Sequence, residues 1–93
     1  MANAPTKAQR AKWEIIRALG CCVCESYQAE IHHCYTCMGG RKNHDAVIPL
    51  CTRHHRGDRG IHTIGRKTWR AEYGTEQELI ERTNAMLQRR NAS

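Results

Sequence analysis

The chain has 93 residues, and its 15 Lys and Arg against nine Asp and Glu leave a net charge of +6. Only 13 residues are Ile, Leu or Val, about 14% against the roughly 20% below which charged chains usually stay disordered. No run of about eighteen apolar residues is present, which excludes a membrane-spanning helix, and no secretory signal is visible. We therefore expect a single cytoplasmic domain, residues 1–93, stabilised by something besides apolar burial.

A helix is predicted over about residues 6–19. Thr6 and Gln9 form a capping box at its start, and Gly20 is a stop signal. Apolar residues at helical spacing form a stripe that we expect to pack on the rest of the domain. The stripe comprises Ala8, Ala11, Ile15 and Leu19, widened by Trp13 and Ile16.

Two short strands and a short helix are predicted within residues 20–62. The strands are Ala29–His33, whose length suits a strand, and Ala46–Leu50, a run that leans toward β-structure. A helix is expected to open at Cys51–Arg56 and to be ended by Gly57 and Gly60.

Two helices are predicted over about residues 66–90. The first runs from Arg66 to Tyr73, and Thr75 with Glu78 caps the longer second helix. One face of the second helix is expected to pack, and it carries Leu79, Ile80, Thr83, Met86 and Leu87. These elements together predict an α+β fold.

All six cysteines and six histidines lie between Cys21 and His62, and the pairs Cys21-x-x-Cys24 and Cys51-x-x-His54 have the spacing of zinc ligands. A Cys-x-x-Cys turn presents two sulfurs to one point, and residues i and i+3 at the start of a helix present two more ligands. Without export, such cysteines are better explained as metal ligands than as disulfides. We therefore expect structural Zn²⁺ at Cys21, Cys24, Cys51 and His54, which would stabilise a chain with few apolar residues.

Two further cysteine features bear on this assignment. Cys34-x-x-Cys37 could form part of a separate zinc site, or replace the first pair as the partner of Cys51, or be incidental. We favour the incidental interpretation because the first pair follows a helix stop, as zinc knuckles do. Cys22 is interpreted as a small buried residue.

Five histidines remain once one is assigned to zinc, and they lie within a 31-residue span. Histidine binds metals and transfers protons near neutral pH, so such a group predicts a functional site. The five are His32, His33, His44, His55 and His62.

Two segments carry a resemblance to a known family: the pair His32-His33 and the later run Val47-Ile48-Pro49-Leu50-Cys51-Thr52-Arg53-His54-His55-Arg56-Gly57. Together they resemble an HNH (His-Me finger, ββα-metal) endonuclease. The Gly20–Cys24 turn and the Tyr73–Leu79 segment narrow this resemblance further. With them, residues 20–87 are similar to the catalytic domain of phage Ref recombination-enhancement nucleases. The resemblance implies a zinc-stapled, treble-clef-like ββα-metal core with flanking helices. It also implies a metal-dependent DNA endonuclease of phage or prophage recombination in a bacterial or phage-infected cell, with a RecA-type filament as a partner.

The resemblance assigns roles to the histidines. His33 would be the general base that takes a proton from water attacking the scissile phosphate. His44 or Asp45 would occupy roughly the place of the family's middle Asn, which fixes the base.

A catalytic divalent ion (Mg²⁺, Mn²⁺ or Zn²⁺) is implied at His32 and His55. His62 would complete that metal site or contact phosphate. In a regular strand His32 and His33 would point to opposite faces, so serving one phosphate requires a twist or a strand end there.

Basic residues near the histidines predict a phosphate-binding rim whose affinity falls with salt. The rim comprises Arg41, Lys42, Arg53, Arg56 and Arg59. Cleavage is expected to be largely independent of sequence because no element resembles a base-reading helix. Nucleic acid is thus the expected partner, and the resemblance favours DNA.

A non-catalytic treble-clef zinc module that binds nucleic acid or protein is the alternative function. It would use the same zinc ligands but would have no use for His33 beside a second metal. A redox protein is disfavoured because neither Cys-x-x-Cys pair follows a strand of a βαβ unit.

Overall fold

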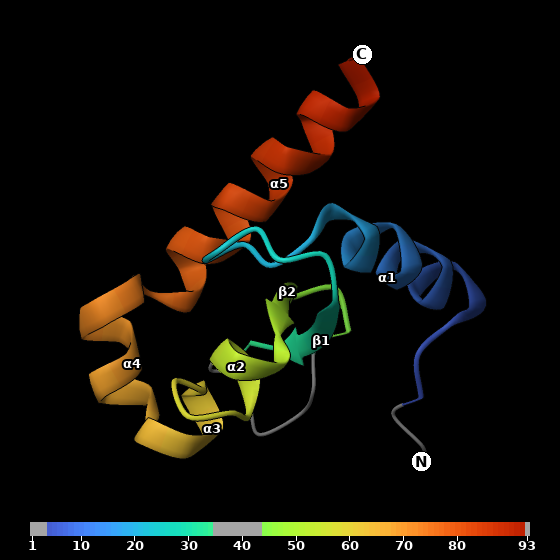
Figure 1. The fold of residues 1–93 in the computed structure, drawn as a ribbon. Coiled ribbons are helices and arrows are strands. Elements are labelled where there is room, and N and C mark those ends of the chain that lie inside the picture. Colours follow the sequence, from blue (N-terminus) through green and yellow to red (C-terminus); the bar gives the residue numbers. More distant parts are fainter. Residues whose placement is uncertain (1–3, 35–43, 93) are drawn as a thin grey trace.

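The structure is a computed structural model that describes residues 4–34 and 44–92. It is a small compact α+β fold with a two-stranded sheet (Figure 1), the fold class that the sequence predicts. No helix within the described ranges is long and apolar enough to cross a membrane. In chain order the elements are α1 (Lys7–Leu19), β1 (Ala29–His33), β2 (Val47–Cys51), α2 (Thr52–His55), α3 (Ile61–Ile64), α4 (Arg66–Tyr73) and α5 (Glu76–Ala92).

The two strands form an antiparallel hairpin at the centre of the fold. Ala29 pairs with Cys51 at one end and His33 pairs with Val47 at the other. The second strand therefore lies one residue later than predicted, because Cys51 keeps an extended backbone and acts as the N-cap of α2. Pro49 is tolerated because β2 has a strand partner on one side only, and its carbonyl oxygen accepts from the N–H of Cys22 at 2.9 Å.

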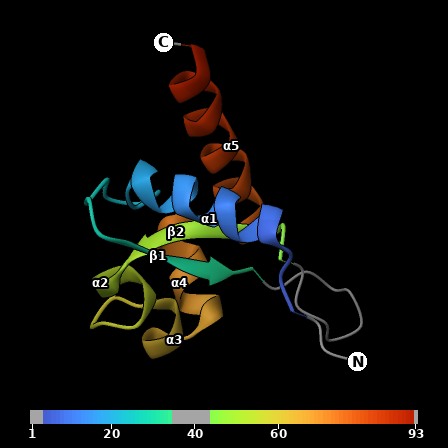
Figure 2. The ribbon, with the colours of Figure 1, turned by 90° about the vertical axis from the view of Figure 1, so that its right-hand side faces the viewer.

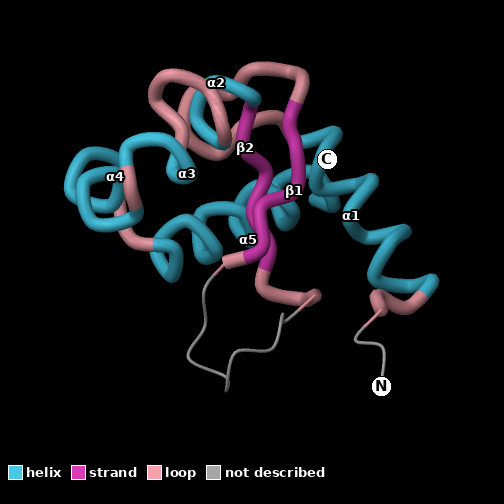
Figure 3. Tube along the Cα trace, turned by 90° about the horizontal axis from the view of Figure 1, so that it is seen from below, coloured by secondary structure: helices cyan, strands magenta, loops and turns pink. Residues whose placement is uncertain are grey.

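The helices lie on both sides of this hairpin. Figure 2 shows α1 crossing the strands on one side, with α2 and α3 on the other, and Figure 3 shows the strands between α1 and the α3–α4 region. α4 leads from α3 to α5, which packs on β2 and α1 and then extends away from the hairpin (Figure 1). Functional side chains on the two faces of β1 consequently meet different helices.

The orientation of α1 differs from the prediction. Ile16 is 2% exposed and Trp13 is half-buried, whereas Ile15 is 42% exposed and Ala8 and Ala11 are exposed. The indole Nε1–H of Trp13 donates to the carbonyl oxygen of His44 at 2.9 Å. Because a partly buried indole N–H needs an acceptor, the tryptophan and not the alanine–isoleucine stripe decides which side of α1 faces the sheet.

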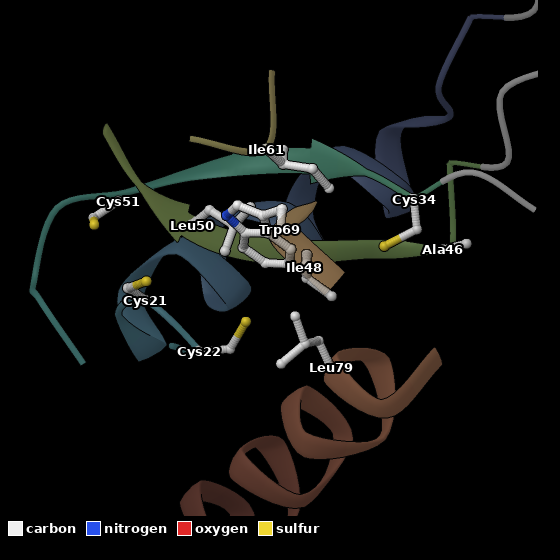
Figure 4. Packing of buried hydrophobic residues seen from close by; sticks show 10 residues of the cluster. All are labelled: Cys21, Cys22, Cys34, Ala46, Ile48, Leu50, Cys51, Ile61, Trp69 and Leu79. Atoms are coloured by element: carbon white, nitrogen blue, oxygen red, sulfur yellow. The ribbon is translucent and has the colours of Figure 1, made fainter. Parts of the chain in front are cut away.

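The apolar core is small and lies between β2, α4 and α5. Ile48, Leu50, Trp69 and Leu79 are 0–1% exposed, and Figure 4 shows Leu79 of α5 pointing toward Ile48 and Cys22. The Trp69 indole N–H donates to the carbonyl oxygen of Arg59 at 3.0 Å, which satisfies its polar atom. Buried cysteines (Cys21, Cys22, Cys34 and Cys51) complete this cluster.

Local capping signals place three of the helices. Thr6 caps α1 with the predicted reciprocal bonds to Gln9, and Thr75 and Glu78 make the same pair of bonds before α5. α4 has the predicted bounds.

The short elements around residue 60 were harder to predict. α2 is Thr52–His55, shorter than predicted, and α3, Ile61–Ile64, was not predicted at all. A four-residue helix has too little periodicity to be recognised.

Candidate metal sites

Four predicted zinc ligands lie together at the junction of the Gly20–Ser26 turn, β2 and α2. The ligand atoms of Cys21, Cys24, Cys51 and His54 all lie within 4.8 Å of one another. The Sγ atoms of Cys24 and Cys51 are 3.6 Å apart, and Cys51 Sγ is 3.2 Å from His54 Nδ1. Two sulfurs bound to one tetrahedral Zn²⁺ would lie about 3.8 Å apart, so this group could hold a metal ion. We call it the Cys₃His group.

The turn that carries the first two cysteines is built by its backbone. Gly20 has φ +90°, and a Cβ atom there would lie 2.9 Å from the carbonyl oxygen of Ser26. The N–H of Cys21 donates to that same carbonyl oxygen at 2.9 Å, which closes the turn. Only glycine fits at the predicted helix stop without moving this loop.

The protonation of the group favours metal binding in two places. Burial raises the pKa of Cys24, but hydrogen bonds from the side chain and backbone of Ser26 outweigh it and leave this pKa below its ordinary value. Burial, followed by the charges of Arg53 and Arg59, lowers the pKa of His54, which keeps its imidazole neutral as a metal ligand requires. Burial raises the pKa of the Cys51 thiol to about 11, so a bound cation would have to displace its proton.

The other described cysteines lie apart from this group. Cys22 is 3% exposed and burial raises its pKa to about 12, in keeping with its interpretation as a small buried residue. Cys34 is 5% exposed, and burial raises its pKa to about 12 as well. Its sequence partner Cys37 lies outside the described residues, so the second pair stays an open interpretation.

Three histidines from three elements form a second group. His32 of β1, His55 of α2 and His62 of α3 bring one ring nitrogen each within 4.8 Å of the others. The Nε2 atoms of His55 and His62 are 3.2 Å apart, and the ring centroids of all three pairs are 4.8–5.3 Å apart. Two nitrogens on one tetrahedral ion would be separated by about 3.4 Å, so this tri-His group could also hold a metal.

Gly60 explains how His62 returns to His55. A Cβ atom at Gly60 would lie 2.6 Å from the carbonyl oxygen of His55 and 2.7 Å from the amide nitrogen of Arg56. The backbone after α2 therefore passes directly over the end of that helix before α3 begins. His62, seven residues beyond His55, faces it for this reason.

Carboxylates hold two of the three imidazoles. Glu30 accepts from His55 Nδ1 at 2.8 Å, and Glu76 Oε2 lies 3.0 Å from His32 Nε2. Hydrogen bonds from Arg56 and His55 lower the pKa of Glu30 to about 2. A carboxylate on the outer nitrogen of a metal-binding imidazole fixes the ring and raises its basicity.

Neither carboxylate was predicted from the sequence. Glu30 stands two residues before His32 on the same face of β1, which alternation could have revealed. Glu76 is 44 residues from His32 and had no local signal.

The exposed member of the tri-His group is His62. Burial lowers its pKa first, and the nearby His32, His55 and Arg66 lower it further. A neutral imidazole with a free lone pair is the form that binds a metal. The side of the group at His62 is therefore the side open to a ligand from solvent.

His33, the predicted general base, lies in a different group. Its Nε2 is 3.0 Å from His44 Nδ1, and its ring contacts the Trp13 indole edge-on at 5.2 Å. Asp45 Oδ2 accepts from the side chain of Gln9 at 3.2 Å. The structure thus brings His33 to His44 beside α1, while its neighbour His32 joins the tri-His group on the opposite face of β1, as strand alternation requires.

The predicted phosphate-binding arginines are held by acidic residues. Arg56 donates to Glu30 at 2.8 Å, Arg59 pairs with Glu72, and Arg53 lies 3.4 Å from Asp58. Arg53 and Arg56 are each about two-thirds exposed, so their guanidinium groups are accessible from solvent. The remaining predicted members, Arg41 and Lys42, lie outside the described residues.

Comparison with known proteins leaves the activity open. The model of a family described as "Protein of unknown function (DUF968)" matches residues 5–88, which is most of the chain. No curated protein matches the chain.

Proposed function

The chain belongs to the DUF968 family, whose function is unknown, and we propose that it is a metal-dependent DNA endonuclease that cleaves with little sequence specificity. One observation carries this proposal. His32, His55 and His62 converge from three separate elements, and carboxylates contact two of the rings, Glu76 at His32 Nε2 and Glu30 at His55 Nδ1. This is the arrangement of a metal site with an accessible side.

The Cys₃His group has a separate role in the proposal. We assign structural Zn²⁺ to Cys21, Cys24, Cys51 and His54, which would make the core a zinc-stapled, treble-clef-like ββα-metal unit. His54 and His55 are consecutive on α2, and only the first belongs to the Cys₃His group. Zinc would thereby anchor the short helix that presents His55 to the catalytic ion.

The chain's own residues would perform the proton transfer. When bound at the tri-His group, a divalent ion (Mg²⁺, Mn²⁺ or Zn²⁺) supplies charge neutralisation at the phosphate and the leaving 3′ oxygen. His33 takes a proton from a water whose oxygen bonds to phosphorus, the bond to the 3′ oxygen breaks, and that oxygen takes a proton from solvent. His44, 3.0 Å from His33, holds the base in place.

The substrate would have to pass over the edge of the sheet. β1 carries His32 and His33 on opposite faces, and among residues 4–34 and 44–92 its one strand partner is β2. A phosphodiester laid across this edge reaches both groups. Arg53, exposed on α2, would contact a neighbouring phosphate.

A second candidate function is supported by the position of His33. Because this histidine contacts His44 and Trp13 on the α1 side, the chain could be a zinc module that binds nucleic acid or protein without catalysis. The tri-His group would then have only a structural role.

Plasmid nicking with Mg²⁺ or Mn²⁺ separates the two functions. His55→Ala and His33→Ala are compared with wild type at equal zinc content, and Arg17→Ala on the exposed side of α1 is the control. We expect at least a hundredfold loss for both histidine variants and none for Arg17→Ala. Equal nicking by all four proteins, or no nicking by wild type, would leave the binding module.

The two histidine variants can also differ in activity, and that outcome tests the two assignments separately. If His55→Ala is inactive and His33→Ala is not, the metal site stands and the assignment of the base is wrong. DNA binding measured by anisotropy tests the rim separately, where Arg53→Ala should lower the salt slope by about one relative to Arg17→Ala. Nicking with and without a RecA filament tests the partner that the resemblance implies.

A further inference from the structure

Glu76 is a buried acid at the first position of α5. Its side chain is 4% exposed, and the His32 ring it contacts is 2% exposed. A buried carboxylate needs partners for both oxygens. Oε2 lies 3.0 Å from His32 Nε2, while Oε1 lies 2.9 Å from Arg70 Nη2 and 3.3 Å from Arg66 Nε.

The two arginines determine what Glu76 can do to His32. With two guanidinium groups at Oε1, the carboxylate is held in its ionised form, which only accepts hydrogen bonds. The Nε2 atom of His32 must therefore carry the proton and donate it to Oε2. In a neutral ring this leaves Nδ1 with the free lone pair, available to a cation.

A metal bound directly by Glu76 is the competing interpretation. His32, Cys34 and Glu76 also bring ligand atoms within 4.8 Å of one another. A cation there would face the guanidinium groups of Arg66 and Arg70 across the same carboxylate. The charges favour Glu76 as a partner of the ligand over Glu76 as a ligand.

We infer that Glu76 is a positioning residue of the tri-His metal site: it fixes the tautomer and orientation of His32 so that Nδ1 faces His55 and His62. The inference rests on the proposed metal-dependent function. It also ties the site to α4 and α5, because the same carboxylate joins Arg66 and Arg70 of α4 to the first turn of α5. Glu30 performs the equivalent task for His55.

The tautomer can be measured in the wild-type protein, so this test does not depend on a variant that folds. The protein is first loaded with one equivalent of Zn²⁺ to fill the Cys₃His group. Nitrogen-15 NMR spectra of the imidazole rings are then recorded before and after a second equivalent of Zn²⁺ is added to fill the tri-His group. We expect His32 to be protonated at Nε2 in both states and its Nδ1 resonance to shift on metal addition. Protonation at Nδ1 before metal is added would overturn the inference.

Metal affinity of variants supplies the second readout. Binding of Mn²⁺ to the zinc-loaded protein is followed by the loss of the free-ion EPR signal for wild type, Glu76→Gln, Arg70→Gln and His55→Ala. Glu81→Gln, an exposed change on the same helix, is the matched control. Glu76→Gln is expected to bind 10- to 100-fold more weakly. Arg70→Gln should lose clearly less affinity, because Arg66 still contacts the carboxylate, and Glu81→Gln should bind like wild type.

These variants separate positioning from stability. Arg70→Gln weakens the link between α4 and α5 but leaves His32 its carboxylate, so a purely structural role for Glu76 would make the two variants weaken Mn²⁺ binding alike. That result, or wild-type affinity in folded Glu76→Gln, overturns the inference. If wild type itself binds no Mn²⁺, the proposed metal site fails, which is distinguishable because His55→Ala then equals wild type.

Discussion

Substitution of Gly60 tests whether the backbone crossing between α2 and α3 builds the tri-His group. Gly60 has φ −79° and ψ 145°, a conformation that alanine adopts without strain. The cost of Gly60→Ala is therefore steric. The added Cβ would stand 2.6 Å from the carbonyl oxygen of His55 and 2.7 Å from the amide nitrogen of Arg56, and both obstacles are backbone atoms.

The magnitude follows from that overlap. Relieving it requires α3 to move away from α2, and overpacking of this kind costs about 1–3 kcal/mol. Alanine also restricts the unfolded chain more than glycine does, which offsets about 0.4–1 kcal/mol of this loss of stability. A net cost near 1–2 kcal/mol remains. His62 is two residues further on and faces His55 at 3.2 Å, so restoring the site on metal binding must meet the steric cost again. The unfolded chain does not enter that equilibrium, and a steric cost of about 1–3 kcal/mol gives a loss of Mn²⁺ affinity of about tenfold or more.

Gly65→Ala is the matched control. No atom lies within 4 Å of a Cβ at Gly65, but its φ of +91° makes alanine strained, at about 1–3 kcal/mol. Both variants should lose similar stability in urea unfolding, and only Gly60→Ala should lose Mn²⁺ affinity in the EPR titration. Wild-type affinity in Gly60→Ala, or an equal loss in both variants, would refute the steric argument.

Four further outcomes are expected. Cys24→Ser should abolish stoichiometric zinc binding and Cys22→Ala should retain it, and metal analysis that finds equal zinc in both would contradict the ligand set. Chelation of zinc from the wild-type protein should unfold residues 20–62, seen as lost far-UV circular dichroism, so a zinc-free protein with an unchanged spectrum would show that the core is sufficient. Hydrogen bonds from the backbone and side chain of Thr75 lower the pKa of Glu78 below its ordinary value of 4.5. The stability that Glu78 contributes is therefore present above pH 4.5 and is lost as the pH falls through the lowered pKa. A carbon-13 NMR titration of Glu78 with a midpoint at or above 4.5 would disprove this. Thr6→Ala should remove the cap of α1 and cost about 1 kcal/mol in urea unfolding, and an unchanged midpoint would argue against the capping box.

Local chemistry made several elements predictable. The capping boxes at Thr6 and Thr75 locate α1 and α5 because each uses side chains only three residues apart. The proximity of Cys21, Cys24, Cys51 and His54 was expected from two short spacings, and the structure brings these side chains together. The roles assigned to them remain predictions for the experiments above.

Orientation was less predictable than position. The apolar stripe predicted on α1 is confirmed in part: Trp13, Ile16 and Leu19 are buried or half-buried, whereas Ala8, Ala11 and Ile15 are exposed. The indole N–H of Trp13 donates to the carbonyl oxygen of His44, 31 residues away. The periodicity of apolar residues describes one helix by itself, so it cannot predict a hydrogen-bond acceptor that lies elsewhere in the chain.

The sequence by itself determined the α+β class, the boundaries set by caps and glycines, and the ligand types available for a metal. Tertiary structure alone decided which histidines share a site. Strand alternation sends His32 and His33 to opposite faces, the crossing at Gly60 returns His62 to His55, and α5 brings Glu76 to His32. The physical reason is that a ligand group is defined by distances between side chains far apart in the chain, and these depend on how the helices pack against the hairpin.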